Sequence, residues 1–114
     1  MTTISDLLKA LSDETRLRII NLVFEKELCV CDLMETLNIT QTKASRHLGI
    51  LKNSGLVIDR KSAQWVYYSI PEKKKSNFLK ILVLEEIRSG ELFINDLENL
   101  NQWLQKKTVS CNFE

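Results

Sequence analysis

The first part of the chain shows two runs of apolar residues at helical spacing. Apolar positions recur every three or four residues over residues 4–11, which predicts a first helix. Residues 12–14, with the sequence Ser-Asp-Glu, provide an N-cap and an acidic first turn for a second helix. The apolar positions of this second helix, from Leu17 to Phe24, form a broad face. We expect these two short helices to pack against each other.

Two further short helices are predicted over residues 30–37 and 41–53. The connection between them is the tripeptide 38–40, in which Thr40 is a good N-cap for the later helix. Ser-Gly at 54–55 provides the stop for that helix. Two short helices joined by a turn of about three residues are typical of a helix-turn-helix.

A change to β-type residues follows directly. Residues 56–60 and 65–70 are rich in β-branched and aromatic side chains, and the four residues between them are mostly polar. This pattern predicts a β-hairpin, a wing, over residues 56–70. Pro71 ends its second strand.

The C-terminal third is helical again. The helix predicted at 76–88 is apolar nearly all round over residues 78–87. One small monomer cannot easily cover such a helix, so we interpret it as a dimerisation element paired with the first helix. After Gly90 a last helix carries a narrow apolar seam from Phe93 to Leu104, which would also suit a partner. The predicted fold class is mainly α with a small β-hairpin, a winged helix-turn-helix homodimer. Its single domain over residues 1–114 divides into dimerisation helices (1–12 and 72–106), a helix-turn-helix (30–53), a wing (56–70) and a tail (107–114).

The amino-acid composition indicates in which cellular compartment the protein is found. Hydrophobic residues make up 44% and charged residues 27%, and no stretch approaches the roughly 18 apolar residues of a membrane span. Charged residues such as Asp6 and Lys9 interrupt the N-terminal leucines, which argues against a signal peptide. The cysteines number three, and two of them are too close for an ordinary disulfide. We therefore expect a cytoplasmic protein with reduced thiols and no membrane segment.

The near-neutral net charge of +1 hides a local basic segment. Residues 40–61 hold five lysines and arginines against Asp59 alone, a balance of +4, whereas residues 1–39 have a balance of −3. A basic segment over a predicted helix-turn-helix and wing favours contact with double-stranded DNA.

The predicted helix 41–53 has the side chains of a DNA-reading element. Ala44, Leu48 and Leu51 form its inward stripe, and the opposite side is polar and basic. Arg46 is our choice for a guanine contact, and Gln41 could read adenine. The alternative is an ordinary solvated helix face, which the basic hairpin that follows makes less favoured. The predicted DNA-binding residues are Gln41, Thr42, Lys43, Ser45, Arg46 and His47 on the helix, with Arg60 and Lys61 on the wing.

His47 is the only histidine and stands far in sequence from other candidate ligands. A phosphate or packing contact is therefore favoured over a metal ligand for this side chain. Catalysis has little support, because the chain shows no Cys/His pair with an orienting carboxylate and no Gly-rich phosphate loop. We expect a protein that is not an enzyme.

Four segments resemble the ArsR/SmtB family of metalloregulators, and in particular its arsenical-resistance operon repressors. These segments are LSDETRLRIINLV (11–23), ELCVCDL (27–33), TQTKASRHLGILKNSGLVIDRK (40–61) and WVYYSI (65–70). The resemblance implies a homodimeric winged-helix repressor that binds operator DNA when metal-free and releases it on binding metal. It also implies arsenite or antimonite as the inducer and no constitutive cofactor.

The chain departs from the family pattern in two places. The common Asp-Pro-Thr-Arg of the family reads Asp-Glu-Thr-Arg at residues 13–16, a mild change because either residue suits a first helical turn. Met34 stands where the arsenical form has a third cysteine. The zinc sensors of the family use His and carboxylate ligands on the helix corresponding to 76–88. That stretch has no histidine here, so a zinc site of this kind is not expected.

ELCVCDL is the most specific of these segments, and it contains Cys29 and Cys31. Side chains two apart in a regular helix point about 200° away from each other and could not share one ion. Cys29, however, falls at a predicted N-cap, whose extended backbone lets the two sulfurs converge. The helix N-terminus should also favour thiolate, and hence a soft ion. The predicted ligands are Cys29 and Cys31, with Cys111 as the candidate third sulfur because the Met34 thioether cannot supply thiolate charge.

Release would follow if ligation distorts the cap and shifts the helix 30–37 against the reading helix. Several other interpretations stay open. Both cysteines could be buried packing residues. The protein could be a winged-helix repressor with a redox or other inducer and no metal site. It could also be a thiol oxidoreductase, although its CxC lacks the usual βαβ context, or a helical module that binds a protein partner.

Overall fold

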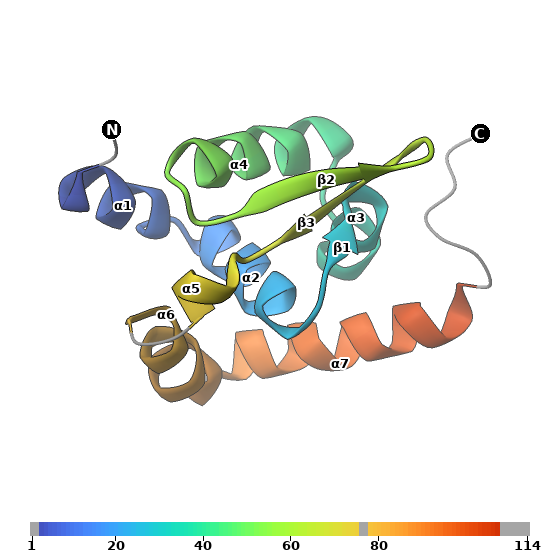
Figure 1. The fold of residues 1–114 in the computed structure, drawn as a ribbon. Helices are drawn as coiled ribbons and strands as arrows, with labels where there is room; N and C mark the ends of the chain where they lie inside the picture. Colours follow the sequence, from blue (N-terminus) through green and yellow to red (C-terminus); the bar gives the residue numbers. More distant parts are fainter. Residues whose placement is uncertain (1–2, 76–77, 108–114) are drawn as a thin grey trace.

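The computed structural model describes residues 3–75 and 78–107, and its fold is shown in Figure 1. Its helices and strands, in chain order, are α1 (Ile4–Leu11), α2 (Glu14–Glu25), β1 (Leu28–Cys29), α3 (Val30–Leu37), α4 (Gln41–Asn53), β2 (Ile58–Ser62), β3 (Trp65–Ser69), α5 (Glu72–Lys75), α6 (Phe78–Ile81), the π-helical turn η1 (Leu82–Glu86), the 3-10 turn η2 (Ile87–Ser89) and α7 (Glu91–Lys106). The predicted helix-turn-helix is therefore α3 and α4, and the predicted wing is the β2–β3 hairpin.

Short-range chemistry fixes the ends of the helices. The side chain of Asp13 accepts a hydrogen bond from the Arg16 N–H and caps α2. Thr40 caps α4 in the same way, and its side chain accepts from the Lys43 N–H. Gly55 has a φ of +82°, a left-handed conformation that favours glycine, and it ends α4. These caps confirm the predicted starts and stops.

A third strand joins the predicted hairpin. The sheet has the order β1-β3-β2, and both pairings are antiparallel. In β1, Cys29 lies opposite Tyr67 of β3. The sequence pattern did not predict β1, because two residues directly before a helix carry no alternation to detect. Cys29 thus belongs to the sheet and also stands at the N-cap of α3.

Helix α2 lies at the centre of the core. Ile19, Ile20, Leu22 and Val23 are all fully buried. In Figure 1, α2 is seen between α4 above it and α7 along the bottom of the molecule, and it packs against both. The predicted broad apolar face is confirmed, and it surrounds most of the helix because elements cover it on several sides.

The described part of the predicted helix 76–88, from residue 78 onward, is not a continuous α-helix. It is divided into α6, η1 and η2, and its buried residues are Leu79, Val83 and Ile87. These residues recur every four positions, slightly more than the 3.6 residues of an α-helical turn. We attribute the π-helical widening to this spacing, because it keeps the three side chains facing the core.

The apolar seam on α7 covers the core of its own chain. Leu100 is buried, and Phe93, Leu97 and Leu104 pack against the core cluster. Apolar side chains remain exposed on α1 and on residues 78–84 instead, and Ile4 (70% exposed) and Ile81 (60%) are the most exposed of them. Homodimerisation through these segments stays a prediction. None of the helices in residues 3–75 and 78–107 combines the length and apolar character needed to cross a bilayer.

Candidate nucleic-acid interface and paired-thiol site

The outer face of α4 is the main part of the candidate nucleic-acid interface. Ala44, Leu48 and Leu51 are buried, as their spacing predicts, and they orient the helix. The polar residues predicted to bind DNA on this helix, other than His47, are all exposed: Gln41, Thr42, Lys43, Ser45 and Arg46. The helix is tied to the wing by an ion pair between Lys52 and Asp59 of β2, at 2.9 Å. The helix and the wing therefore form one connected surface.

His47 does not belong to this exposed set. Its side chain is 3% exposed, and its Nδ1 atom lies 3.0 Å from a guanidinium nitrogen of Arg16. Burial excludes a direct phosphate contact in this conformation, so the predicted DNA contact of His47 is wrong for this structure. The packing contact that we considered beside it fits the structure.

The two basic wing residues differ in their surroundings. Lys61 is exposed on β2. Arg60 is also exposed, but its guanidinium makes two hydrogen bonds of 2.7 Å to the Glu27 carboxylate and lies 5.1 Å from the centre of the Tyr67 ring. These hydrogen bonds raise the pKa of Arg60. A phosphate would have to compete with Glu27 for this guanidinium.

The two nearby cysteines share one buried cluster. Cys29 is 3% exposed and Cys31 is 4% exposed, and the rings of Trp65, Tyr67 and Trp103 pack against them. Burial, the largest cause, raises the pKa of the Cys29 thiol above its usual value. The expectation that the helix N-terminus favours a Cys29 thiolate is therefore wrong, because burial and the adjacent Asp32 carboxylate disfavour the charged form.

Asp32 connects this cluster to the C-terminal helix. One of its carboxylate oxygens accepts from the Cys29 N–H at 3.0 Å and from the Cys29 thiol at 3.4 Å. Its other oxygen accepts from the Trp103 indole N–H at 2.8 Å and from the Lys107 ammonium group. Burial alone would raise the pKa of Asp32, but hydrogen bonds from Lys107, Trp103 and the Cys29 N–H hold it below its usual value. Asp32 is thus a buried carboxylate that joins α3 to α7.

The candidate ligand set is incomplete in the described part of the chain. Within residues 3–75 and 78–107, no three His, Cys, Asp or Glu side chains gather closely enough to hold a metal ion. Cys111, the predicted third sulfur, lies outside the described residues. Of the predicted tail at 107–114, only Lys107 is described. The expectation of reduced thiols is wrong for Cys31, which is disulfide-bonded in this structure, whereas Cys29 is a free thiol. The structure therefore provides two sulfurs in one cluster and leaves the third ligand a prediction.

The architecture defines a class of protein before any comparison. A helix-turn-helix followed by a β-hairpin wing, with an exposed polar face on the second helix, is a winged helix-turn-helix domain. A model of the family described as "Bacterial regulatory protein, arsR family" matches residues 13–59.

Known proteins that are similar to the chain include two resistance regulators and one transcriptional repressor of solved structure. The chain is 51% identical over 71 residues to the arsenic resistance transcriptional regulator ArsR2 of Pseudomonas putida, which covers 61% of this chain and 62% of that protein. It is 40% identical over 80 residues to the cadmium resistance transcriptional regulatory protein CadC of Listeria innocua, covering 69% of this chain and 67% of that protein. The crystal structure of the transcriptional repressor BigR from Xylella fastidiosa aligns at 28% identity with a TM-score of 0.67, covering 77% of this chain and 87% of that one.

The chain therefore belongs to the arsR family of bacterial regulatory proteins and has a winged helix-turn-helix fold. This confirms the resemblance carried by the four sequence segments. The match spans less than two thirds of the Pseudomonas regulator.

Proposed function

We propose that this protein is a transcriptional repressor that responds to arsenite or antimonite. It binds operator DNA as a homodimer when metal-free and releases the DNA when its thiols ligate the inducer. One observation carries this proposal: Cys29 and Cys31 lie in one buried cluster at the start of α3, and α3 packs against the DNA-reading helix α4. The 51% identity to an arsenic resistance regulator supports this choice of inducer.

The surface of α4 supports the DNA-binding half of the proposal. Arg46 and Gln41 project from an exposed face whose opposite side is anchored in the core. Guanidinium and amide groups are suited to hydrogen bonding with guanine and adenine edges in the major groove. Lys43 and Lys61 add positive charge for phosphates, which positions the helix without reading sequence.

The sheet supports the release half. Once the Cys31 disulfide is reduced, both thiols are soft donors, and such donors fit arsenite, antimonite and also cadmium. Cys29 pairs with Tyr67 of the wing strand β3 and also starts α3. A displacement of its sulfur would therefore reach the wing through β1 and the reading helix through α3. Couplings of about 1–3 kcal/mol are typical of allosteric proteins and correspond to about a 5–150-fold change in affinity.

The test uses a duplex selected by the reduced protein from a random DNA library, called here the selected duplex. We expect arsenite to weaken wild-type binding to it by about 5–150-fold, as measured by fluorescence anisotropy. Cys29→Ser and Cys31→Ser should bind the selected duplex like wild type but stay bound at arsenite concentrations that release wild type. Cys111→Ser tests the third ligand, and Met34→Leu is the matched control that removes a sulfur without removing a thiol.

The outcomes separate the competing interpretations. Failure to select any duplex would contradict the DNA-binding half. Release of Cys29→Ser by arsenite at the wild-type concentration would contradict the ligand assignment. Release by peroxide but not by arsenite would favour a redox inducer, and release by cadmium at lower concentration than arsenite would assign the inducer to the other resistance class.

A second prediction concerns the wing. Glu27→Gln is expected to strengthen binding to the selected duplex about twofold to fivefold at low salt, because Arg60 becomes available to a phosphate. The slope of log affinity against log salt should steepen by about one per wing, since each phosphate contact releases counterions. Glu27→Gln combined with Arg60→Gln is the control, and it should lose the gain. An unchanged salt slope in Glu27→Gln would mean that Arg60 does not reach the backbone.

A further inference from the structure

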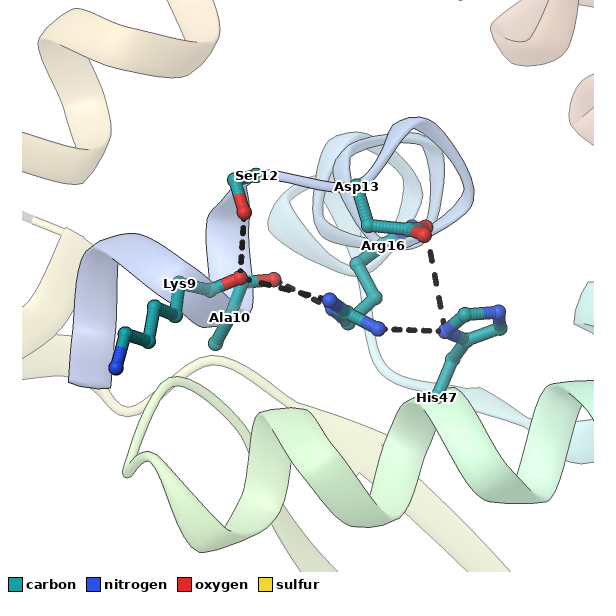
Figure 2. Close-up of polar contacts among 6 residues, drawn as sticks. All are labelled: Lys9, Ala10, Ser12, Asp13, Arg16 and His47. Atoms are coloured by element: carbon teal, nitrogen blue, oxygen red, sulfur yellow. Dashed lines mark hydrogen bonds and ion pairs between the residues drawn. The ribbon is translucent and has the colours of Figure 1, made fainter.

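Arg16 makes an unusual set of contacts at the corner where α1 meets α2. Figure 2 shows its guanidinium between the end of α1 and the His47 ring on α4. The Nε atom donates to the Ala10 carbonyl at 2.6 Å, and Nη2 donates to the Lys9 carbonyl at 3.4 Å. Both carbonyls belong to the last turn of α1, and the Lys9 carbonyl also accepts from the backbone N–H and the hydroxyl of the C-cap residue Ser12. The remaining nitrogen, Nη1, lies 3.0 Å from Nδ1 of His47.

This contact determines the protonation state of His47. A guanidinium group can only donate hydrogen bonds, so the Nδ1 atom must be the acceptor and can carry no proton. The ring is then neutral, with its hydrogen on Nε2. Burial, the largest cause, lowers the pKa of His47 below its ordinary value of 6.5, which agrees with this geometry.

A second potential partner stands close to the same atom. The Oδ1 atom of Asp13 lies 4.0 Å from Nδ1 of His47, beyond hydrogen-bonding distance (Figure 2). The same oxygen accepts from the backbone N–H of Arg16 at 3.0 Å. A proton on Nδ1 would turn an acceptor facing Arg16 into a donor facing a cation. The ring would be repelled by Arg16 and attracted by Asp13. The Nδ1 atom therefore has two alternative partners, and its proton selects between them.

The other charges around His47 do not change the protonation state inferred for its ring at neutral pH. Asp13 is the acidic group that faces the ring, and it favours the protonated form. Arg16, together with Lys43 and Arg46 on the same helix as His47, disfavours it. At neutral pH the ring is neutral and bonded to Arg16.

We propose that Arg16 and His47 are positioning residues for DNA binding, which fix α4 against the α1–α2 corner, and that protonation of His47 releases α4 from that orientation. His47 precedes Leu48 in the buried stripe and follows Arg46 on the exposed face, so a displacement of its ring is transmitted to the reading side chains. The inference rests on the proposed DNA-binding function but not on the thiol site or on any inducer.

The sign of the effect distinguishes this role from simple electrostatics. An added positive charge on the DNA-reading helix would by itself strengthen attraction to the phosphates as pH falls. Release of α4 would weaken binding instead. If only the neutral form binds, affinity falls by up to about tenfold per subunit for each pH unit below the pKa of His47 in the free protein.

The experiment measures affinity for the selected duplex between about pH 8 and pH 5, a range that contains histidine titration. His47→Asn keeps an acceptor near the Nδ1 position but cannot be protonated. His47→Gln is its matched control, since its amide lies nearer the Nε2 position and cannot replace the contact with Arg16. We expect wild type to weaken on acidification and His47→Asn to bind like wild type at the high end without that loss. His47→Gln should be about tenfold weaker for each half-site throughout the range.

Circular dichroism at each pH, with all variants at one concentration, shows whether the fold persists over the range. Wild-type affinity that is constant or rises on acidification overturns the proposal. It is also overturned if His47→Asn and wild type have the same pH profile, or if wild type loses affinity only where its fold is lost. Absence of wild-type binding at the high end of the range is a different result, which would overturn the DNA-binding function together with this inference.

Discussion

Asp32→Ala is expected to lower the free energy of unfolding by about 3–5 kcal/mol, the largest effect on stability that we predict for a single polar residue of this chain. Asp32 is 1% exposed, and its two oxygens accept from four donors. Its removal leaves the Trp103 indole N–H and the Cys29 N–H without their acceptor and the Lys107 charge without its partner. Each buried donor that loses its partner costs about 1–3 kcal/mol.

Urea denaturation at fixed protein concentration, followed by circular dichroism and by tryptophan emission, measures this loss. Asp32→Asn separates charge from shape, because the amide keeps one accepting oxygen but turns an NH2 group toward donors; we expect it to be nearly as destabilising. Asp59→Ala is the surface control, and it should leave the midpoint almost unchanged because its ion pair with Lys52 is exposed to solvent. A midpoint for Asp32→Ala within the range of the Asp59 control would show that α7 is not anchored by this carboxylate.

The helices that the sequence predicts correctly are those whose ends are marked by capping or stop residues nearby in the sequence. Thr40 and Gly55 bound α4 through contacts made within four residues, so the information is contained in a short stretch of chain. The hairpin is equally local, because β2 and β3 are consecutive and pair directly. Periodicity and caps were sufficient for these elements.

The surroundings of the thiols could not be predicted in the same way. Trp103 and Lys107 stand 71 and 75 residues from the Asp32 carboxylate that they contact. The sequence around Asp32 does not predict this contact, and neither does the sequence around Trp103 and Lys107. Tertiary packing alone places α7 over α3. The rise in the pKa of Cys29 follows from that packing, which is why reasoning from the helix N-terminus alone predicted the opposite direction.

His47 was a different kind of error, because the sequence did contain the evidence. The buried residues of α4 are Ala44, His47, Leu48 and Leu51, which is the full i, i+3, i+4, i+7 pattern of a helix face. Counting only apolar residues omitted the one polar member of that face. Its partner Arg16 lies 31 residues earlier and could not be identified without the fold.

Arg46→Ala is expected to weaken binding to the selected duplex by about tenfold to a hundredfold for each half-site, with little change in stability. Arg46 is exposed on the face of α4 opposite the buried stripe, so its removal opens no cavity in the core. A bidentate contact between arginine and a guanine edge is worth about 1–3 kcal/mol of discrimination. The proposed homodimer would lose that contact twice, which makes this the largest effect on DNA binding that we predict.

Arg46→Lys provides the matched control, because it keeps the charge and loses the planar pair of donors. If Arg46 reads guanine, the lysine variant should resemble the alanine variant on the selected duplex, and both should discriminate less against replacement of one guanine in each half-site. If Arg46 contacts phosphate instead, the lysine variant should bind nearly like wild type. The alanine variant would then lose affinity equally for all duplexes and flatten the salt slope by about one per half-site. The lysine variant binds weakly if Arg46 reads guanine and nearly like wild type if Arg46 contacts phosphate. Affinity measurements on two duplexes therefore decide between base reading and phosphate contact.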